Sequence, residues 1–316
     1  MDDVNSNVKL LERFLKDAIL RGWSEWAIKS CKYSLLMFFE QIGKSCLNVD
    51  MDDLRNYLIY LQGRPGKLGK KKPAHATIKK HIDNLASFYQ YLEFEELVVK
   101  SPIPKFRVRY VLPLISNKSG DIPRQIISVR QMSELISSTA DSQEKALICL
   151  MAKTGIRVGE LMAIDLENID WGNQSIKLKP TGKRTNLTVF FDNECANCLK
   201  RWLNTRKTLA KGNVPYLFVI PSNGRRINHT FIIRIVERNA ARIGLHDDKS
   251  ADLGKRFTPH CCRHWFTTHM RKGGMPREYI KELRGDTRGE TIDIYDHIDM
   301  EELKMSYMEC VPQLGI

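Results

Sequence analysis

The sequence lacks the long apolar stretches of membrane proteins and the ordered cysteines of secreted ones. No apolar run approaches the roughly 18 residues that a membrane-spanning helix needs. The start, MDDVNSNVKLLERF, does not have the basic and then apolar order of a signal peptide. The 8 cysteines are scattered along 316 residues, so we expect reduced thiols. These features predict a protein of the cytoplasm or nucleoid that has no membrane partner.

Motifs for metal and nucleotide chemistry are also missing. There is no GxxxxGK[ST] loop for ATP, and the DxD and DxE patterns that occur do not cluster to supply the paired carboxylates of a two-metal nuclease. The CxxC formed by Cys195 and Cys198 has no second pair at zinc-finger spacing, so we interpret both as thiols on a helix. The sequence therefore predicts no metal site and no cofactor.

Positive charge is what the sequence has in excess. Lys and Arg number 50 against 37 Asp and Glu, which gives a formal net charge of +13. Such a surplus favours a polyanion partner, nucleic acid, over a basic surface that binds nothing. Residues 64–80 carry seven cations and no acid, which favours a contact with the DNA backbone over a merely solvated loop. These cations are Arg64, Lys67, Lys70, Lys71, Lys72, Lys79 and Lys80.

The first part of the chain has the pattern of a small helical bundle. Apolar residues recur at helical spacing through residues 1–100. Ser24 is placed to cap a helix that Gly43 ends, and Asp50 precedes a further helix. We expect residues 1–100 to form one helical domain.

The rest of the chain predicts a linker and a second domain, as a length of 316 residues allows. Residues 101–127 contain four prolines and no helical period, so we expect a linker there. Residues 128–316 begin with helices and contain a β-hairpin formed by residues 175–179 and 187–191. The chain then ends in a helix from about residue 300 to 310.

Three segments of the second domain carry side chains that suit phosphate chemistry. In TGIRVGEL (154–161), Arg157 lies where a loop turns into a helix, and Glu160 lies on the same helical face, where it can hold the guanidinium. TPHCCRHWFTTH (258–269) places His260 and Arg263 on one side of a helix start, and GETIDIYDHID (289–299) contains Tyr295. Taken singly, each is better explained as a structural pair or a half-buried tyrosine.

Together and in this order, the segments resemble the tyrosine recombinase, or phage integrase, family, which includes the Xer-type chromosome-resolving recombinases. They are similar to the family's TGxRxxEL, HxLRHTFATH and TTxxYxH boxes, and KPTGKRTNLTVFF (179–191) resembles its GK-containing β-turn. The resemblance covers nearly the whole chain. It implies a mainly α protein with a small β-hairpin or sheet (α+β), in which a helical core-binding domain (1–100) and a catalytic domain (128–316) form a C-shaped DNA clamp.

The resemblance also implies a reaction that needs neither metal nor ATP. Tyr295 attacks the scissile phosphate and leaves a 3′-phosphotyrosyl link and a free 5′-hydroxyl. Because a tyrosine has a pKa near 10 and is a weak nucleophile at neutral pH, it needs a proton acceptor, for which His260 is the candidate. Arg157 and Arg263 would clamp the non-bridging oxygens, with Glu160 as a supporting residue.

The general acid is implied to lie on the hairpin. Lys183 would protonate the departing 5′-oxygen, and we select it because a glycine precedes it, as in the family's GK turn. Lys177, Lys179 and Arg184 lie on the same hairpin, where most cations are only solvated.

One position departs from the family pattern. Asp286 stands nine residues before Tyr295, where the family usually has a histidine or tryptophan that donates to the phosphate. An ionised carboxylate beside a phosphate is repulsive. Two explanations stay open: Asp286 holds an arginine, or a neighbour such as Arg284 or Arg288 donates instead.

The resemblance predicts a site-specific recombinase that acts on a double-stranded DNA target as a homo-oligomer, a monomer when free and a tetramer in the synaptic complex. Its role would be integration or excision of a mobile element, with Xer-type resolution of chromosome or plasmid dimers as the alternative. A type IB topoisomerase-like relaxing enzyme and a non-catalytic DNA-binding regulator are further alternatives. The C-terminal tail helix either caps its own domain or docks on the next protomer.

Overall fold

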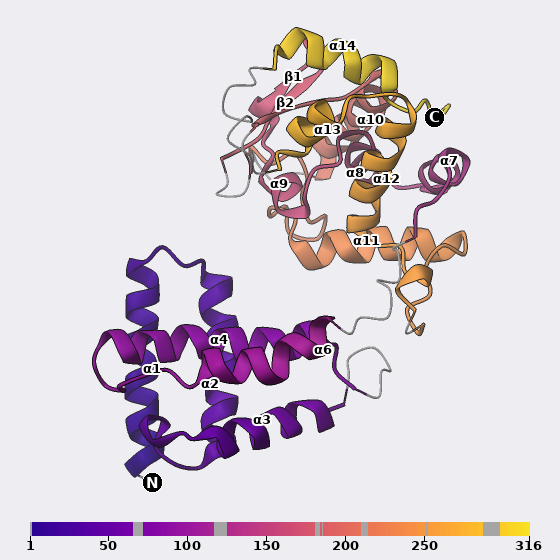
Figure 1. Ribbon diagram of the computed structural model, residues 1–316. Helices are drawn as coiled ribbons and strands as arrows, with labels where there is room; N and C mark the ends of the chain where they lie inside the picture. Colours follow the sequence, from indigo (N-terminus) through magenta and orange to yellow (C-terminus); the bar gives the residue numbers. More distant parts are fainter. Residues whose placement is uncertain are drawn as a thin grey trace. The chain divides into compact units, whose positions relative to one another are not determined.

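The structure is a computed structural model that describes residues 2–65, 72–116, 125–180, 184, 186–209, 214–250, 252–286 and 298–316. The chain divides into two compact units, Met1–Asp121 and Ile122–Ile316. Both units are mainly helical, and the second contains a small antiparallel sheet (Figure 1). The prediction of a mainly α fold with a small β element is confirmed.

The first unit is a bundle of amphipathic helices. These are α1 (Asp2–Leu20), α2 (Glu25–Ile42), the 3-10 turn η1 (Cys46–Asn48), α3 (Met51–Gly63) and α4 (His75–Phe94). Ser24 caps α2 by accepting a hydrogen bond from the backbone N–H of Ala27, and Gly43 ends the helix with φ of 59°. Asp50 begins α3 in a capping box with Asp53. The helix starts and stops predicted from Ser24, Gly43 and Asp50 are therefore confirmed.

Residues 103–116 differ from the linker that the sequence predicts. They form α5 (Ile103–Phe106), the π-helical turn η2 (Arg107–Val111) and α6 (Leu112–Ser116). The reason is apolar burial: Ile103, Phe106 and Val111 insert into the core of the first unit. Pro104 lies at the start of α5, where the N–H that proline lacks would have no helical partner. The remainder of the expected linker lies partly outside the described residues.

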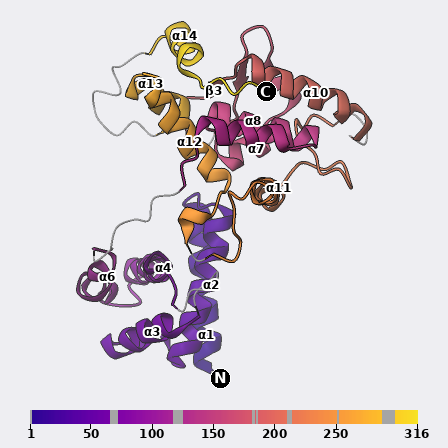
Figure 2. The same cartoon turned by 90° about the vertical axis from the view of Figure 1, so that its right-hand side faces the viewer.

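The second unit is organised around one buried helix, α8. In chain order its elements are α7 (Val129–Ser138), α8 (Ser142–Thr154), α9 (Val158–Ala163), η3 (Leu166–Asn168), β1 (Ile169–Asp170), β2 (Ser175–Lys177), β3 (Thr188–Phe190), α10 (Asn193–Leu209), α11 (His229–Arg242), η4 (Leu253–Lys255), α12 (Pro259–Lys272), α13 (Arg277–Arg284) and α14 (Met300–Cys310). α10 and α12 pack against α8, whose residues are buried from Ala146 to Thr154. α12, α13 and α14 lie side by side (Figure 2).

The predicted hairpin is present. β2 pairs antiparallel with β3, with Ser175 opposite Phe190 and Lys177 opposite Thr188. A third strand, β1, pairs with the other side of β2 and was not predicted. Its two residues are too few to show the alternation by which a strand is recognised. In the turn of the hairpin, residues 181–183 and 185 lie outside the described residues.

The C-terminal segment folds back onto its own unit. Tyr307 of α14 is buried, and its hydroxyl donates to the carbonyl oxygen of Lys153 at 3.0 Å. Beyond α14, a carboxylate oxygen of Glu194 accepts the backbone N–H of Leu314 at 2.8 Å. The buried ammonium of Lys153 donates to the carbonyl oxygen of Pro312 at 2.6 Å. In this structure the tail therefore packs on its own unit.

Candidate functional site

The C-terminal end of α13 is where the two predicted arginines meet a third. The carbonyl oxygen of Arg284, the last residue of α13, accepts hydrogen bonds from Arg157 Nη1 (3.3 Å), Arg184 Nη1 (3.0 Å) and Arg263 Nη2 (3.0 Å). The last carbonyl groups of a helix have no partner within it and carry the negative end of the helix dipole. This end of α13 therefore gathers guanidinium groups from three distant parts of the sequence.

Arg157 is held by the start of α9. It is the N-cap residue of that helix, and its backbone N–H donates to Glu160 Oε2 at 2.7 Å. Its guanidinium donates from Nη1 to Glu160 Oε1 at 3.0 Å. Glu160 thus fixes both the backbone and the side chain of Arg157, which is the contact that the three-residue spacing predicts.

Arg263 reaches the same place from the N-terminal part of α12. It is buried, and its Nη1 donates to the carbonyl oxygen of Gly155 at 2.7 Å. Burial, followed by the positive charges of Arg157 and Arg284, lowers the pKa of Arg263 to about 10. The guanidinium therefore stays charged at neutral pH.

Gly155 makes this close approach possible. It ends α8 with φ of +61°, and a Cβ on it would lie 2.4 Å from Cδ1 of Phe266. Phe266 lies one turn after Arg263 on α12. A glycine is therefore required here both by the left-handed backbone and by the space that α12 occupies.

Asp286 is the anion at the centre of the arginine cluster. Its Oδ1 accepts from Arg157 Nη2 at 3.1 Å and from Arg263 Nη2 at 2.9 Å. Its Oδ2 lies 3.0 Å from Arg284 Nε. Of the two explanations for an aspartate at this position, the structure supports the first, in which Asp286 holds arginines, and extends it to two arginines that share one oxygen.

Arg184 is the residue of this cluster to which the sequence analysis gave no role. Its guanidinium is buried, pairs with Glu160 Oε2 at 3.1 Å, and donates from Nη2 to the carbonyl oxygen of Leu283 at 2.6 Å. Burial lowers its pKa, and the charge of Glu160 opposes that effect. Arg184 and Asn186 are both buried and both bond to the end of α13, a placement that no pattern local in the sequence marks.

The other predicted catalytic residues are only partly described. His260 lies exposed on the first turn of α12, with its ring edge-on to that of His264 at a centroid distance of 4.7 Å. It is three residues before Arg263, which points into the protein. Tyr295 and Lys183 lie outside the described residues.

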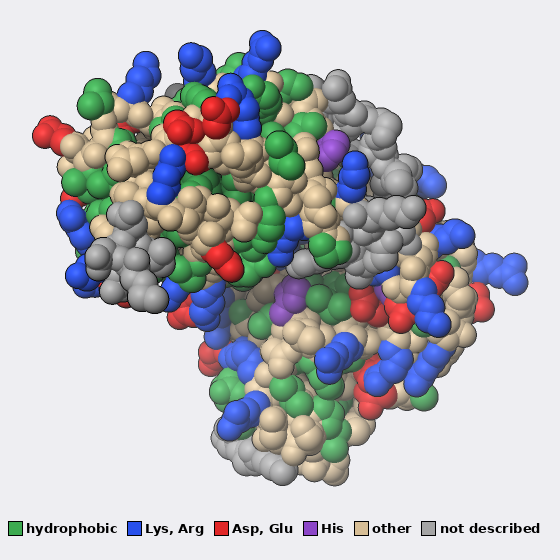
Figure 3. All heavy atoms as spheres, turned by 90° about the horizontal axis from the view of Figure 1, so that it is seen from below, with side chains coloured by type: hydrophobic (Ala, Val, Ile, Leu, Met, Phe, Trp, Pro, Cys, Tyr) green, Lys and Arg blue, Asp and Glu red, His purple; other side chains and the backbone are tan. Residues whose placement is uncertain are grey.

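The predicted DNA-contact residues lie on the first unit, and those described have an exposed side. Lys72 is exposed, Lys79 pairs with Asp83, and Arg64 donates to the hydroxyl of Tyr33 at 3.3 Å. In the space-filling view, Lys and Arg side chains are spread over the visible face with fewer Asp and Glu side chains among them (Figure 3). Three of the predicted contacts lie outside the described residues: Lys67, Lys70 and Lys71.

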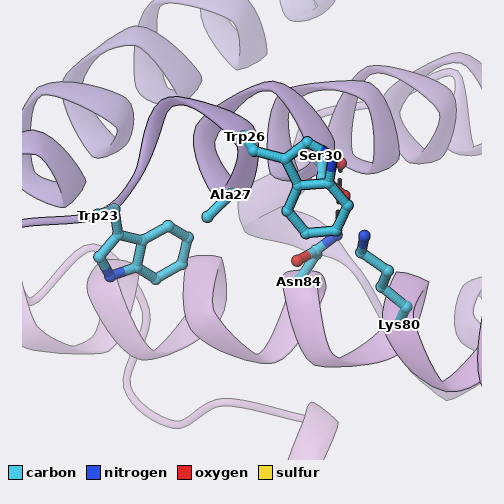
Figure 4. Close-up of a pocket in the computed structure, with 6 residues that line it drawn as sticks. All are labelled: Trp23, Trp26, Ala27, Ser30, Lys80 and Asn84. Carbon is cyan, nitrogen blue, oxygen red and sulfur yellow. Dashed lines mark hydrogen bonds between the residues drawn. The ribbon is translucent and has the colours of Figure 1, made fainter. Parts of the chain in front are cut away.

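Lys80, the seventh cation, borders a surface pocket of about 340 Å³ on the first unit (Figure 4). Its Nζ lies 3.6 Å from the ring centroid of Trp26, a side chain that is 69% exposed. An ammonium group at this distance is attracted to the face of the ring. The lining residues are Trp23, Trp26, Ala27, Ser30, Lys80 and Asn84.

Seven of the eight cysteines are buried, and Cys310 is partly exposed. Cys195 and Cys198 are buried on α10, as helix thiols. A hydrogen bond with Cys149 and burial raise the pKa of the Cys198 thiol well above its usual value. Among the described residues, no three His, Cys, Asp or Glu side chains are grouped to hold a metal ion. The described helices include none with the length and apolar character to span a membrane.

Comparison with protein families gives one match over more than half of the chain. Residues 125–302 match the model of the phage integrase family. Curated tyrosine recombinases match along most of their length. One from Thermosipho africanus is 24% identical over 288 residues, which covers 90% of this chain and 93% of the relative. The tyrosine recombinase XerC of Herpetosiphon aurantiacus is 28% identical over 302 residues (91% and 90%). XerA of Saccharolobus solfataricus is 24% identical over 307 residues (96% and 92%).

Solved structures share the fold. The integrase of the Tn1549 transposon, in complex with circular intermediate DNA, superposes with a TM-score of 0.67 at 17% identity and covers 94% of this chain and 98% of that one. The XerH site-specific recombinase bound to its difH substrate gives a TM-score of 0.63 at 21% identity (94% and 82%).

Proposed function

Because the chain belongs to the phage integrase family of tyrosine recombinases, we propose that it cleaves and rejoins duplex DNA at a specific site through a 3′-phosphotyrosyl intermediate. One observation supports this most directly: Arg157 Nη2 and Arg263 Nη2 lie 3.1 and 2.9 Å from a single oxygen, Oδ1 of Asp286. Two guanidinium groups that share one anionic oxygen have the arrangement that a phosphodiester requires.

In the proposed cleavage step, the phenol oxygen of Tyr295 attacks the scissile phosphorus and the bond from phosphorus to the 5′-oxygen breaks. His260 accepts the proton of the phenol, and Lys183 gives a proton to the departing oxygen. Arg157 and Arg263 stabilise the negative charge that grows on the non-bridging oxygens. One phosphate ester replaces another, so the 5′-hydroxyl of a second strand can reverse the step without ATP.

The proposed reaction also needs no divalent metal. At the end of α13, four guanidinium groups surround two carboxylates, so the cluster keeps a positive charge of its own. The guanidinium groups are already held by Glu160 and by helix carbonyls, so little reorganisation is needed when charge develops on the phosphate.

The proposed partner is double-stranded DNA, bound by several copies of the chain. The relatives with solved structures include one in complex with circular intermediate DNA and one bound to its difH substrate. The net charge of +13 supports the same partner. Lys72, which is exposed, and Lys80, whose Nζ lies against the Trp26 ring, offer cationic groups to phosphates on the first unit. We propose a tetramer on two sites, acting in the cytoplasm at the nucleoid.

The proposed role is integration or excision of a mobile element, supported by the likeness to the Tn1549 transposon integrase. The second candidate role, Xer-type resolution of chromosome or plasmid dimers, is supported by the curated relatives named XerC and XerA. Recombination assays on plasmids separate the two. One plasmid carries paired copies of the DNA that flanks the coding region, and the other carries paired copies of the chromosomal terminus region.

The reaction class is tested with nicked suicide duplexes tiled across both DNA regions. We expect a covalent protein–DNA band that forms in EDTA and is missing in Tyr295→Phe. Absence of the band with the unmutated protein, while DNA is still bound, would instead indicate a non-catalytic regulator. Relaxation of supercoiled plasmid by a monomer, without strand exchange between sites, would indicate a topoisomerase-like enzyme.

A further inference from the structure

The anion between Arg157 and Arg263 belongs to the protein itself. We propose that Asp286 is a resident counter-ion that occupies the phosphate position of the DNA-free protein, and that the scissile phosphate must displace it before cleavage. The inference rests on the proposed function only in assigning a phosphate oxygen to these two arginines. It concerns the position at which the family usually has a hydrogen-bond donor and this chain has a carboxylate.

The shared oxygen is the first observation that supports this inference. Asp286 Oδ1 accepts from both Nη2 atoms, at 3.1 Å from Arg157 and 2.9 Å from Arg263. A carboxylate that served only to position the two arginines would leave their inward Nη2 groups for the substrate. This carboxylate instead receives the hydrogen bonds that a non-bridging phosphate oxygen would receive. We call these two Nη2 groups, of Arg157 and Arg263, the arginine fork. Two anions at the fork repel each other, so phosphate and carboxylate compete for it.

Differences in exposure indicate which group moves. The side chain of Arg263 is 4% exposed, whereas that of Asp286 is 32% exposed. Arg263 is also tied to the carbonyl oxygens of Gly155 and Arg284, so it is fixed independently of Asp286. Arg157 is as exposed as Asp286, at 34% against 32%, but Glu160 holds both its backbone N–H and its Nη1. The arginines therefore keep their places when the carboxylate leaves.

The backbone of Asp286 allows the side chain to turn without moving α13. Gly285 ends the helix with φ of 59°, and the N–H of Asp286 donates to the carbonyl oxygen of Lys281 at 3.2 Å. This helix-ending hydrogen bond fixes the main chain, while the side chain retains its staggered rotamers. Arg284 Nε lies 3.0 Å from Oδ2, so the carboxylate keeps a cationic partner when it releases Oδ1.

In this proposal the Asp286 carboxylate occupies the arginine fork until a DNA phosphate displaces it. Binding of a DNA phosphate at the fork is favoured by the many other contacts between protein and DNA. A free phosphate ion is bound only by the fork itself. The DNA-free protein should therefore bind inorganic phosphate weakly, and removal of the Asp286 carboxylate should uncover the site.

The test measures inorganic phosphate binding to the full-length chain by titration calorimetry. Asp286→Asn keeps the size of the side chain and removes its charge, and we expect it to bind phosphate about tenfold or more tightly than the unmutated chain. Glu144→Gln is the control, because it likewise removes one negative charge beside an arginine, Arg238, to which no contact with DNA or phosphate is assigned. We expect no gain in the control.

Two further variants make the result specific to the fork. Adding Arg263→Ala to Asp286→Asn should abolish the gain. Asp286→Ser repeats the test if the asparagine variant does not keep the helical circular dichroism of the parent. Phosphate affinity that is unchanged or lower in both Asp286 variants would overturn the proposal and leave Asp286 as a positioning residue.

Phosphate binding does not depend on the reaction, so the two hypotheses fail separately. The titration is repeated in a Tyr295→Phe background, which cannot form a covalent link. If phosphate affinity rises but no covalent DNA band forms in the parent, the counter-ion is retained and the recombinase chemistry is rejected. If the band forms but phosphate affinity does not rise, the recombinase chemistry is retained and the counter-ion proposal is rejected.

Discussion

Arg184 and Glu160 form an ion pair that is buried on both sides, with Nη1 of Arg184 3.1 Å from Oε2 of Glu160 and the two side chains 0% and 2% exposed. The same carboxylate holds Arg157 through its other oxygen, at 3.0 Å. Arg184 therefore links the hairpin to the arginine that we assign to the phosphate. Its loss should affect both stability and the reaction.

Arg184→Ala should lower the free energy of unfolding by about 3 kcal/mol, because it leaves a buried carboxylate with one partner fewer. The comparison is Arg238→Ala, which removes an arginine that pairs with Glu144 but is 56% exposed. That change should cost less than about 1 kcal/mol. Urea denaturation of the full-length variants measures both, and equal small losses would argue against a structural role for the buried pair.

Gly155→Ala should lower the stability of the second unit strongly. The left-handed backbone alone costs about 1–2 kcal/mol, and the clash of the new Cβ with Phe266 adds about 1–3 kcal/mol. Gly22→Ala has a comparable φ of +76° but nothing within 4 Å of the added Cβ, so it should show the backbone cost alone. Thermal melting compares the two, and similar losses would mean that the contact with Phe266 relaxes freely.

Neutralising the cations of residues 64–80 should weaken binding to all DNA sequences alike. Replacing Lys70, Lys71 and Lys72 by Ala should flatten the log–log dependence of DNA affinity on salt by roughly 0.9 for each phosphate that the variant no longer neutralises. Fluorescence anisotropy with two unrelated duplexes across a salt series measures the slope.

The control for this charge change lies elsewhere on the first unit. Lys9, Lys16 and Lys100 are exposed, and replacing them removes the same total charge. We expect their slope to stay close to that of the parent. If the salt dependence of DNA affinity is also unchanged in the Lys70–Lys72 variant, these lysines do not contact DNA phosphates and the segment is only solvated.

Stability of the first unit should fall as the pH drops from about 6.5 to about 4. His81 is buried with Nδ1 3.1 Å from the hydroxyl of Tyr57, and burial, then Arg64 and Lys80, lower its pKa to about 4. Between the two pKa values the unfolded chain binds a proton that the folded chain does not, so stability is complete above pH 6.5 and declines below it. After allowance for partial hydration of the ring, the loss is roughly 2 kcal/mol.

Hydrogen exchange of α4 peptides in the full-length protein measures this pH dependence. His81→Asn retains a side chain that can bond to Tyr57 but does not titrate, so it should remove the part of the decline that His81 causes. Carboxylates that protonate below pH 5 affect parent and variant alike. An identical decline in both would show that His81 does not contribute.

Local spacing predicted those parts of the fold and site that depend on neighbours in sequence. The contact between Arg157 and Glu160 follows from their spacing of three positions at a helix start. The caps at Ser24 and Asp50 follow from side-chain oxygens that can accept hydrogen bonds from the first N–H groups of a helix. A carboxylate at position 286 was recognised as incompatible with a phosphate. The distances that bring its oxygen to both arginines come only from the tertiary structure.

The features that the sequence missed depend on long-range packing. Residues 103–116 carry prolines and no clear helical period, yet three apolar side chains buried in the first unit make them helical. Arg184 looked like one of several solvated hairpin cations, because its partners, Glu160 and Leu283, lie 24 and 99 residues away in sequence. No local pattern encodes such contacts.

The central claim, that Arg157 and Arg263 hold the scissile phosphate, is tested most directly by comparing cleavage with binding. Single-turnover cleavage of a nicked suicide duplex and the affinity for the same duplex are measured for Arg157→Ala, Arg263→Ala and the control Arg238→Ala. We expect the first two variants to lose about a hundredfold or more in cleavage rate while they keep most of their affinity, and the control to match the parent. Equal losses in cleavage and affinity, or cleavage at the parental rate, would contradict the claim.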